Sequence, residues 1–360
     1  MAANFDLANM ALQATCPANE LLYDDLGMPS VMVKIPKMTY AQLGMGSSTA
    51  VHPAFIVNGT EVDAIWISKY QNIVQNSRAY SLPSVDPKTS INFDAAKAAC
   101  DAKGDGWHLM TQMEWGLLVR WCQMNGVIPK GNNNYGKHSS ENVYKAIPAT
   151  KDAEHYAVRT MTGTGPLTWY HNQEADGIAD LCGNVWEWSG AMRSVCGELQ
   201  ILANNNGSDS AKSQSATSTE WKAIRASDGA LITPNGSGTT SGSIKMDWVD
   251  SKLTFSNTIT DSAPGAHSCT FANIVCNASI GSDAKLLLQN LGLLMYGEEA
   301  ELFSAQSAYF NNAEEERLFF SGGNSSHSAY GLASFNGNSP RSGANGSIGF
   351  RSAFVRLPTA

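Results

Sequence analysis

The stretch GGNSSHSAYGLASFNGNSPRSGANGSIGFR runs from residue 322 to residue 351, and it decides how the rest of the sequence is interpreted. It opens on two glycines, continues through small and polar residues interrupted by Tyr330 and Phe335, and ends on the motif IGFR at 348–351. A stretch so rich in glycine and polar residues does not form a helix, and it lacks sustained alternation. We therefore expect short strands and turns laid over a surface.

The composition of this stretch is restricted. Residues 324–347 contain no Lys, Glu, Gln, Met or Trp, although these five types make up 63 of the 360 residues. At the chain's own composition, such a gap arises by chance in roughly one segment in a hundred. These five types are also the ones that an asparagine codon ending in a pyrimidine cannot become when its adenines are replaced. Adenine-directed mutagenesis would leave this composition, and an ordinary Gly/Ser/Asn-rich surface loop is the alternative interpretation.

The whole-chain composition indicates a loop-rich globular protein. The chain has 360 residues, 43% hydrophobic and only 16% charged, so it can bury a core in one large or two ordinary domains. A net charge of −8 argues against general nucleic-acid binding and against binding to anionic membranes. No apolar run is long enough to span a bilayer, and no Lys or Arg precedes the first apolar residues. We expect a soluble protein without a Sec signal peptide, made in the cytoplasm and exported only by other means.

We expect the cysteines and the last arginines of the chain to have structural roles. Seven cysteines show no CxxC pair and no zinc-type spacing; they are Cys16, Cys100, Cys122, Cys182, Cys196, Cys269 and Cys276. Free buried thiols are expected, with a bridge between Cys269 and Cys276 as the alternative. Beyond Glu316 no acidic residue occurs, and we expect the four arginines of this region to fix turns and carboxylates; they are Arg317, Arg341, Arg351 and Arg356.

Three segments have the pattern of strands. Near-alternating β-branched and aromatic residues predict strands at 31–35 and 61–70. A third strand is expected after the turn Gly183-Asn184. In it Trp186 and Trp188 point to the same side, because side chains alternate along a strand, and we expect both to anchor a core.

Three segments have the pattern of helices. Residues 92–103 are alanine-rich and begin at a capping asparagine. Thr111 and Glu114 have the spacing of a capping box at the start of an amphipathic helix that ends at Asn125-Gly126. A further helix is expected over 283–295. Helices inside an otherwise β-rich chain predict an α+β fold.

Three motifs together resemble one family. HLMTQMEWGLLVRW at 108–121 is similar to a helix entry normally written with Leu-Pro-Thr before Glu-Ala-Glu-Trp, and DLCGNVWEW at 180–188 is close to the family's most recognisable motif. The glycine pair at 322–323 and IGFR at 348–351 match its closing pair. The chain thus resembles the formylglycine-generating-enzyme (sulfatase-modifying factor) branch of the C-type lectin fold. The resemblance covers residues 60–354 and implies a C-type lectin-like fold of this subtype with long loops and insertions.

The chain departs from the enzymes of this family at their redox cysteine pair. The first cysteine would fall at His327 and the second near Leu332, and no cysteine occurs after Cys276. The reaction of those enzymes needs a thiolate pair. We therefore expect no catalytic residues and no enzymatic activity, with a sulfatase-modifying-factor-like enzyme of altered chemistry as the alternative.

The other branch of this architecture comprises the variable proteins of diversity-generating retroelements, including phage receptor-binding (tropism determinant) proteins. They keep the Gly-Gly and Ile-Gly-Phe-Arg ends and vary the residues between them, so the chain looks like such a protein. The resemblance implies a hypervariable surface that binds a host or target cell-surface protein or glycan. It places the protein at a virion tail tip or on a cell surface, with homo-oligomers raising a modest single-site affinity. Neither nucleic-acid binding nor membrane insertion is expected.

Under this resemblance the segment divides into fixed and substitutable positions. The fixed positions set the backbone; they are Gly322, Gly323, Ala329, Gly331, Leu332, Ile348, Gly349, Phe350 and Arg351. The expected variable, ligand-binding positions are Asn324, Ser325, Ser326, His327, Ser328, Tyr330, Ser334, Phe335, Asn336, Asn338, Ser339, Gly343 and Ser347. Tyr330 and Phe335 are the expected anchors, with core packing as the alternative for Phe335. His327 is interpreted as a contact residue rather than a metal ligand or general base.

No cofactor is expected, although one group of oxygens leaves calcium open. Asp176, Asp180, Asn184 and Glu187 lie close in sequence and offer oxygen ligands, and a solvated acidic turn is the alternative. The expected organisation is an N-terminal segment 1–28 of unclear role followed by one C-type lectin-like domain, 29–360. Within that domain we expect a surface insertion with a hairpin at 203–243 and a variable region at 322–351.

Overall fold

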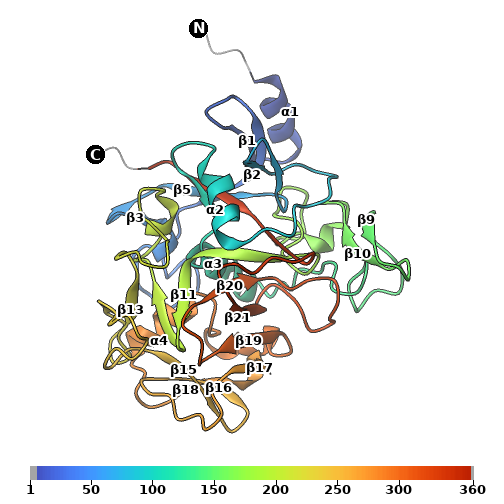
Figure 1. Cartoon of the computed structure of the whole chain (residues 1–360). Helices are drawn as coiled ribbons and strands as arrows, with labels where there is room; N and C mark the ends of the chain where they lie inside the picture. Colours follow the sequence, from blue (N-terminus) through green and yellow to red (C-terminus); the bar gives the residue numbers. More distant parts are fainter. Residues whose placement is uncertain (1–5, 358–360) are drawn as a thin grey trace.

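The computed structural model describes residues 6–357, apart from the side chains of residues 298–300. In the described part of the chain there are four α-helices, two large sheets and three two-stranded ones. Figure 1 shows the helices packed against the sheets, which confirms the expected α+β class. The small sheets are formed by β3 (Ile56–Val57) with β4 (Thr60–Glu61), β6 (Ile73–Gln75) with β7 (Arg78–Tyr80), and β9 (Pro148–Lys151) with β10 (Ala157–Thr160).

The five-stranded sheet joins strands from the two ends of the sequence (Figure 1). Its order is β1 (Asn19–Tyr23), β2 (Pro29–Pro36), β5 (Ala64–Ser68), β23 (Ser352–Val355) and β8 (Trp107–Leu109), and every neighbouring pair is antiparallel. The strands expected at 31–35 and 61–70 are confirmed as β2 and β5. All of β5 is buried, as expected of a central strand covered on both faces.

The N-terminal segment supplies the edge of this sheet. Helix α1 (Leu7–Thr15) lies beside β1, and the side-chain oxygen of Asn9 accepts a hydrogen bond from the backbone N–H of Leu21 at 2.8 Å. Because this side chain occupies an amide on the outer side of β1, the helix helps to protect an exposed edge strand. Residues 1–5 and 358–360, which the expected divisions 1–28 and 29–360 include, lie outside the described residues.

The twelve-stranded sheet holds most of the second half of the chain. Its main path is β17 (Ala266–Thr270), β19 (Ser307–Asn311), β21 (Phe335–Ser339), β20 (Arg317–Ser321), β11 (Trp186–Val195), β12 (Glu198–Ile201), β15 (Lys245–Val249), β16 (Lys252–Ser256) and β18 (Ile274–Cys276). β22 (Ile348–Phe350) pairs in parallel with β11, so the end of the 322–351 stretch lies directly on the tryptophan-bearing strand.

Residues 203–243 are anchored more firmly than their composition indicates. The expected hairpin is present as β13 (Lys222–Ile224) and β14 (Leu231–Ile232), and β13 also pairs with β12. Trp221 is fully buried, and the guanidinium of Arg193 lies 4.6 Å from the centre of its ring. This stretch therefore extends the main sheet.

Helices α2 and α3 follow the expected patterns. α2 (Phe93–Asp101) begins at Asn92, whose side chain accepts a hydrogen bond from the backbone of Ala95. α3 (Gln112–Met124) begins at Thr111, and the capping box with Glu114 is present in both directions. None of the helices in residues 6–357 is both long and apolar enough to cross a bilayer.

The fourth helix is shorter than expected. α4 (Ser282–Asn290) ends five residues before the expected end at 295. Gly292 has a φ of +68°, and a Cβ on Gly116 of α3 would lie 2.0 Å from the carbonyl oxygen of Asn290. α4 thus stops where its end packs directly on the backbone of α3, a contact that the hydrophobic pattern of 283–295 does not encode.

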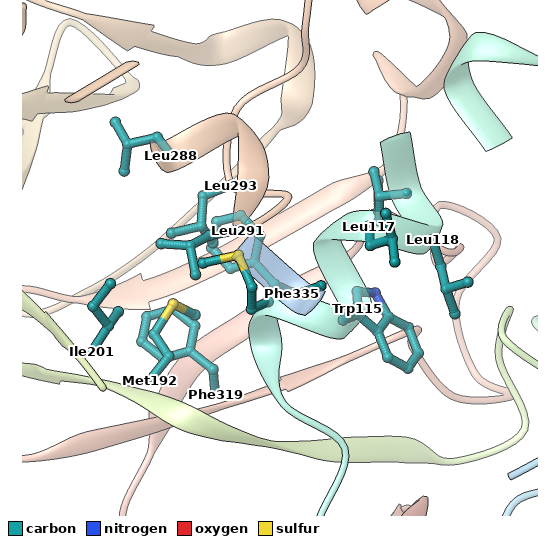
Figure 2. Close-up of a cluster of buried hydrophobic side chains, with 14 of the residues drawn as sticks. Trp115, Leu117, Leu118, Met192, Ile201, Leu288, Leu291, Leu293, Phe319 and Phe335 are labelled. Carbon is teal, nitrogen blue, oxygen red and sulfur yellow. The ribbon is translucent and has the colours of Figure 1, made fainter. Parts of the chain in front are cut away.

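Two cores lie on opposite faces of the twelve-stranded sheet. On one face, side chains of α3, α4 and the sheet form the larger core; those labelled in Figure 2 are Trp115, Leu117, Leu118, Met192, Ile201, Leu288, Leu291, Leu293, Phe319 and Phe335. On the other face, Trp186 and Trp188 pack with Phe93 of α2, Phe320 and Phe350. The expectation that both tryptophans anchor a core is confirmed.

A buried ion pair joins the two large sheets. Arg351 lies between β22 and β23, and its guanidinium donates to both carboxylate oxygens of Glu187 at 2.8 and 2.9 Å. It also donates to the carbonyl oxygens of Ser68, Lys69 and Ala179. Both charged side chains are at most 2% exposed. The pair therefore ties β11 to the end of β5.

We expect Arg351→Met and Glu187→Met each to lower the free energy of unfolding by about 3–5 kcal/mol, because each leaves an uncompensated buried charge. The double variant removes both charges, so its loss should be well below the sum of the single losses. Urea unfolding followed by tryptophan fluorescence measures all three. Arg225→Met, which breaks an exposed pair with Asp228, is the control and should cost less than about 1 kcal/mol. Strictly additive losses at Arg351 and Glu187 would contradict the coupling.

Candidate ligand-binding surface

The glycine pair sets the entry into the C-terminal segment, residues 322–351. Gly322 and Gly323 have φ values of +89° and +83°, which L side chains rarely adopt. A Cβ on Gly323 would lie 2.2 Å from the Cβ of Tyr330, and one on Gly322 would lie 2.9 Å from the carbonyl oxygen of Leu181. Both positions therefore require glycine for conformation and for space, as the sequence predicts.

Side chains outside the segment hold its first loop by the backbone. The indole N–H of Trp115 in α3 donates to the carbonyl oxygen of Leu332 at 2.9 Å. The amide of Asn133 donates to the carbonyl oxygens of Ser328 and Tyr330 at 3.1 and 2.9 Å. Because these bonds reach only main-chain atoms, they are independent of which side chains the loop carries.

A third side chain completes this support. The Oε1 atom of Gln306 accepts a hydrogen bond from the backbone N–H of Ala333 at 2.7 Å. A Cβ on Gly331 would lie 2.5 Å from the same Gln306 side chain. The sequence does not mark Gln306, Asn133 or Trp115 as supports, because each of them binds backbone atoms at least 27 positions away.

The thirteen expected variable positions fall into three classes of exposure. Three are exposed: Ser326, His327 and Ser328. Seven are half-buried: Asn324, Tyr330, Asn336, Asn338, Ser339, Gly343 and Ser347. Three are buried: Ser325, Ser334 and Phe335. The first two classes make up what we call the candidate surface, and the buried three are corrections to the expected set.

Phe335 is a core residue. It is 1% exposed and packs edge-on against Phe271, with ring centres 5.7 Å apart, and against Phe319 at 6.0 Å (Figure 2). It is the first residue of β21, where side chains alternate, so Phe335 and Gly337 point inward while Asn336 points outward. The alternative that the sequence left open, core packing, is the observed one.

The two buried serines fix the loop itself. The hydroxyl of Ser325 donates to the carbonyl oxygen of Val158 at 2.7 Å. The hydroxyl oxygen of Ser334 accepts from the backbone N–H of Gly331 at 3.1 Å, and its proton is directed to the carbonyl oxygen of Ala329 at 3.4 Å. Small polar side chains are buried here because backbone groups satisfy them.

Tyr330 is the centre of an aromatic cluster on the candidate surface. Its ring centre lies 4.8 Å from that of buried Trp186, 5.0 Å from that of His327 and 6.2 Å from that of Tyr309. Desolvation, followed by a hydrogen bond with Tyr309, raises the pKa of Tyr330 above its ordinary value. The phenol therefore stays protonated at neutral pH and keeps a hydrogen-bond donor.

The second loop of the segment lies next to the first, beside Trp186. The backbone N–H of Trp186 donates to the carbonyl oxygen of Ser347 at 2.8 Å, while the indole of the same residue packs on Tyr330. Arg341 is bound by Glu316 at 2.9 Å and by Asp94 at 2.7 Å. The cation of this loop is thus paired with carboxylates, as the sequence predicts.

The other three arginines beyond Glu316 also have partners. Arg351 binds Glu187, and Arg317 lies 3.2 Å from the carboxylate of Glu314. Arg356 lies over the ring of Trp66, 4.9 Å from its centre, and no carboxylate of the described residues pairs with it. The expectation that these arginines bind carboxylates is therefore confirmed at three of the four positions.

The four residues considered for calcium do not form a shared set of ligands. Arg351 occupies both oxygens of Glu187, a backbone amide donates to Asp180 at 2.7 Å, and Asn184 is bonded to the protein at both ends of its amide. Burial raises the pKa of Asp180 to about 6. Among the described side chains, those of residues 6–297 and 301–357, no three of His, Cys, Asp or Glu are grouped to hold a metal. Asp180, Asn184 and Glu187 are at most 2% exposed, so the turn is buried and hydrogen-bonded and is not the solvated acidic turn of the alternative.

All seven cysteines are free, so the alternative bridge between Cys269 and Cys276 is not present. Cys182 lies nearest to the candidate surface, with its sulfur 3.6 Å from the carbonyl oxygen of Tyr330. Burial raises its pKa to about 12 and also raises the pKa values of Cys100 and Cys122. These buried thiols are therefore protonated at neutral pH and are poor nucleophiles.

Deleting a ring should distinguish core from surface positions of this segment. Phe335→Ala should lower the free energy of unfolding by about 3–5 kcal/mol, because it leaves a cavity between Phe271 and Phe319. His327→Ala also deletes a ring, and it should cost less than about 1 kcal/mol because His327 is exposed. Chemical denaturation measures both variants. Similar losses in the two would contradict this division of the segment.

Comparisons with known proteins give little support for a relationship. No protein-family model matches the chain, and no curated protein sequence matches it. The solved structures that are weakly similar include the following two. Treponema denticola variable protein 1 has a TM-score of 0.34 and 11% identity, covering 94% of this chain and 100% of its own. PvdO from Pseudomonas aeruginosa has a TM-score of 0.33 and 13% identity, covering 91% of this chain and 95% of its own. At these TM-scores neither match assigns a fold subtype or a function.

Proposed function

We propose that this protein is a ligand-binding protein of the C-type lectin-like fold, formylglycine-generating-enzyme subtype, whose candidate surface carries exchangeable side chains. A diversity-generating retroelement varies these side chains. The ligand is a host or target cell-surface protein or glycan, and the protein acts at a phage tail tip or on a cell surface. One observation carries the proposal: Trp115, Asn133 and Gln306 hold the first loop by its backbone, while ten expected variable positions remain at least partly exposed.

The charge of the candidate surface supports a neutral ligand. Arg341 is the one Lys, Arg, Asp or Glu within residues 324–347, and two carboxylates bind it. Binding through this surface therefore relies on hydrogen bonds and aromatic contacts, which Tyr330, the serines and the asparagines provide. A surface without fixed charges also tolerates replacement of its side chains, because no ion pair across it has to be kept.

The alternative, a sulfatase-modifying-factor-like enzyme, gains no support from the site. His327 stands where the first cysteine of those enzymes would lie, and Leu332 at the second position is buried. Burial raises the pKa of the Cys182 thiol, whose sulfur lies 3.6 Å from the carbonyl oxygen of Tyr330, to about 12. A thiol in that state does not supply the thiolate that such chemistry uses.

Diversification leaves a trace in the genome. We expect a near-identical, adenine-rich copy of the codons for 320–352 close to this gene, beside a reverse transcriptase gene. The copy should differ from the gene chiefly at codons of the candidate surface. Sequencing the gene, its flanks and many clonal isolates makes the comparison. An invariant sequence across residues 324–347 in every isolate would count against diversification.

A library gives the direct test of binding. Randomising the ten positions of the candidate surface should leave most members folded, because the backbone supports lie elsewhere. Display of this library against ubiquitin, a small neutral protein, should yield members that bind it with Kd values around micromolar or tighter. A matched library at Ser325, Ser334 and Phe335 should yield few folded members. Failure to recover any ubiquitin binder from a folded library would contradict the proposed function.

A further inference from the structure

The row of side chains that includes Asn336 continues past the C-terminal segment. In the twelve-stranded sheet Asn336 of β21 pairs with Tyr309 of β19, and Tyr309 pairs with Ser268 of β17. Residues paired directly across neighbouring strands point to the same face of a sheet. Ser268, Tyr309 and Asn336 therefore form one row, of which only Asn336 belongs to the expected variable positions.

This row is covered at one end and open at the other. In the opposite direction Asn336 pairs with Phe320 of β20, which is 4% exposed and packs on Trp186 and Trp188 in the core below α2. At β19 and β17 the same face is open: Tyr309 is half-buried and Ser268 is exposed, and neither belongs to this core among the described residues. The same sheet face thus changes from core to surface at β21.

Core packing does not account for the position of Tyr309. Its neighbours in β19, Ala308 and Phe310, point to the opposite face and are fully buried in the larger core. Tyr309 points outward and packs edge-on against Tyr330, with ring centres 6.2 Å apart. A large aromatic side chain is therefore held, partly exposed, against two positions of the candidate surface.

No charged side chain points outward from this part of β17 and β19. The outward row next to Tyr309 and Ser268 consists of Ala266 with Asn311, and the side chain of Asn311 donates to Asn338 at 3.0 Å. His267 belongs to the other face of β17 and binds Asp261 at 2.7 Å. The open sheet face and the candidate surface are therefore continuous and equally neutral.

We infer that the binding surface extends beyond the C-terminal segment onto β19 and β17, and that Tyr309 is a fixed contact for protein ligands there. The inference rests on the proposed function. Tyrosine provides a large contact area with few rotatable bonds and one hydroxyl, so it serves ligands that differ in detail. Every ligand then has to present an uncharged patch with a hydrogen-bonding group to Tyr309, while the exchangeable positions select among such patches.

The test uses ubiquitin binders selected from the candidate-surface library in the full chain. Tyr309→Ala and Tyr309→Phe are introduced into several independent binders, and Kd values for ubiquitin are measured by biolayer interferometry. Tyr309→Ala should weaken most binders about tenfold or more. Tyr309→Phe keeps the ring and its packing but removes the hydroxyl, so it should weaken binding about threefold. If the alanine variant is unstable, the phenylalanine variant alone tests whether Tyr309 contacts the ligand. Tyr23→Ala, at a 45% exposed tyrosine of β1 in the other sheet, is the matched control and should leave Kd unchanged.

The outcomes separate the two claims. Binders whose Kd changes less than twofold with either Tyr309 substitution would overturn the fixed contact and leave the proposed function intact. A library without any ubiquitin binder would overturn the proposed function, and the fixed contact with it. Melting temperatures of the Tyr309 variants close to that of the parent, together with weakened binding, would establish a contact rather than a structural role.

Discussion

The buried pair between Arg351 and Glu187 is the constraint on which the rest of the structure depends. Two charges removed from water are tolerated only when each is fully paired, and here the guanidinium also satisfies three carbonyl oxygens. The pair fixes β22 on β11 and sends the chain into β23 between β5 and β8. The C-terminal segment therefore leaves and re-enters the fold at two rigid points, the glycine pair and Arg351.

Between these two points one set of side chains supports the backbone of the segment, and another set is exposed and available to a ligand. Trp115, Asn133 and Gln306 reach main-chain atoms of the first loop, so these three supports remain when the exposed side chains of the loop change. The buried members, among them Ser325 and Phe335, take part in the support and are poor candidates for exchange. This separation allows a surface to change its chemistry while the free energy of folding stays nearly constant.

The sequence predicts local features well and long-range features poorly. The capping box of Thr111 depends on residues three positions apart, so it is legible in the sequence, and the same holds for the two tryptophans of β11. For Phe335 the sequence leaves both a binding anchor and core packing open, because a single phenylalanine among Asn, Gly and Ser gives no alternation that shows which face of a strand it occupies. The hydroxyl of Ser325 donates to a carbonyl oxygen 167 positions away, and the side chain of Asn133 binds the backbone of a loop nearly 200 residues away. Neither partnership leaves a local pattern.

The most direct test of this account is the crystal structure of a variant with several exposed positions of the candidate surface replaced together. The substitutions are Ser326→Tyr, His327→Asp, Ser328→Asn and Asn338→His. If the frame holds the segment independently of its exposed side chains, the Cα atoms of residues 322–351 should superpose on those of the parent within about 1 Å. A rearranged loop, or loss of the hydrogen bonds from Asn133 and Trp115 to its backbone, would contradict the account.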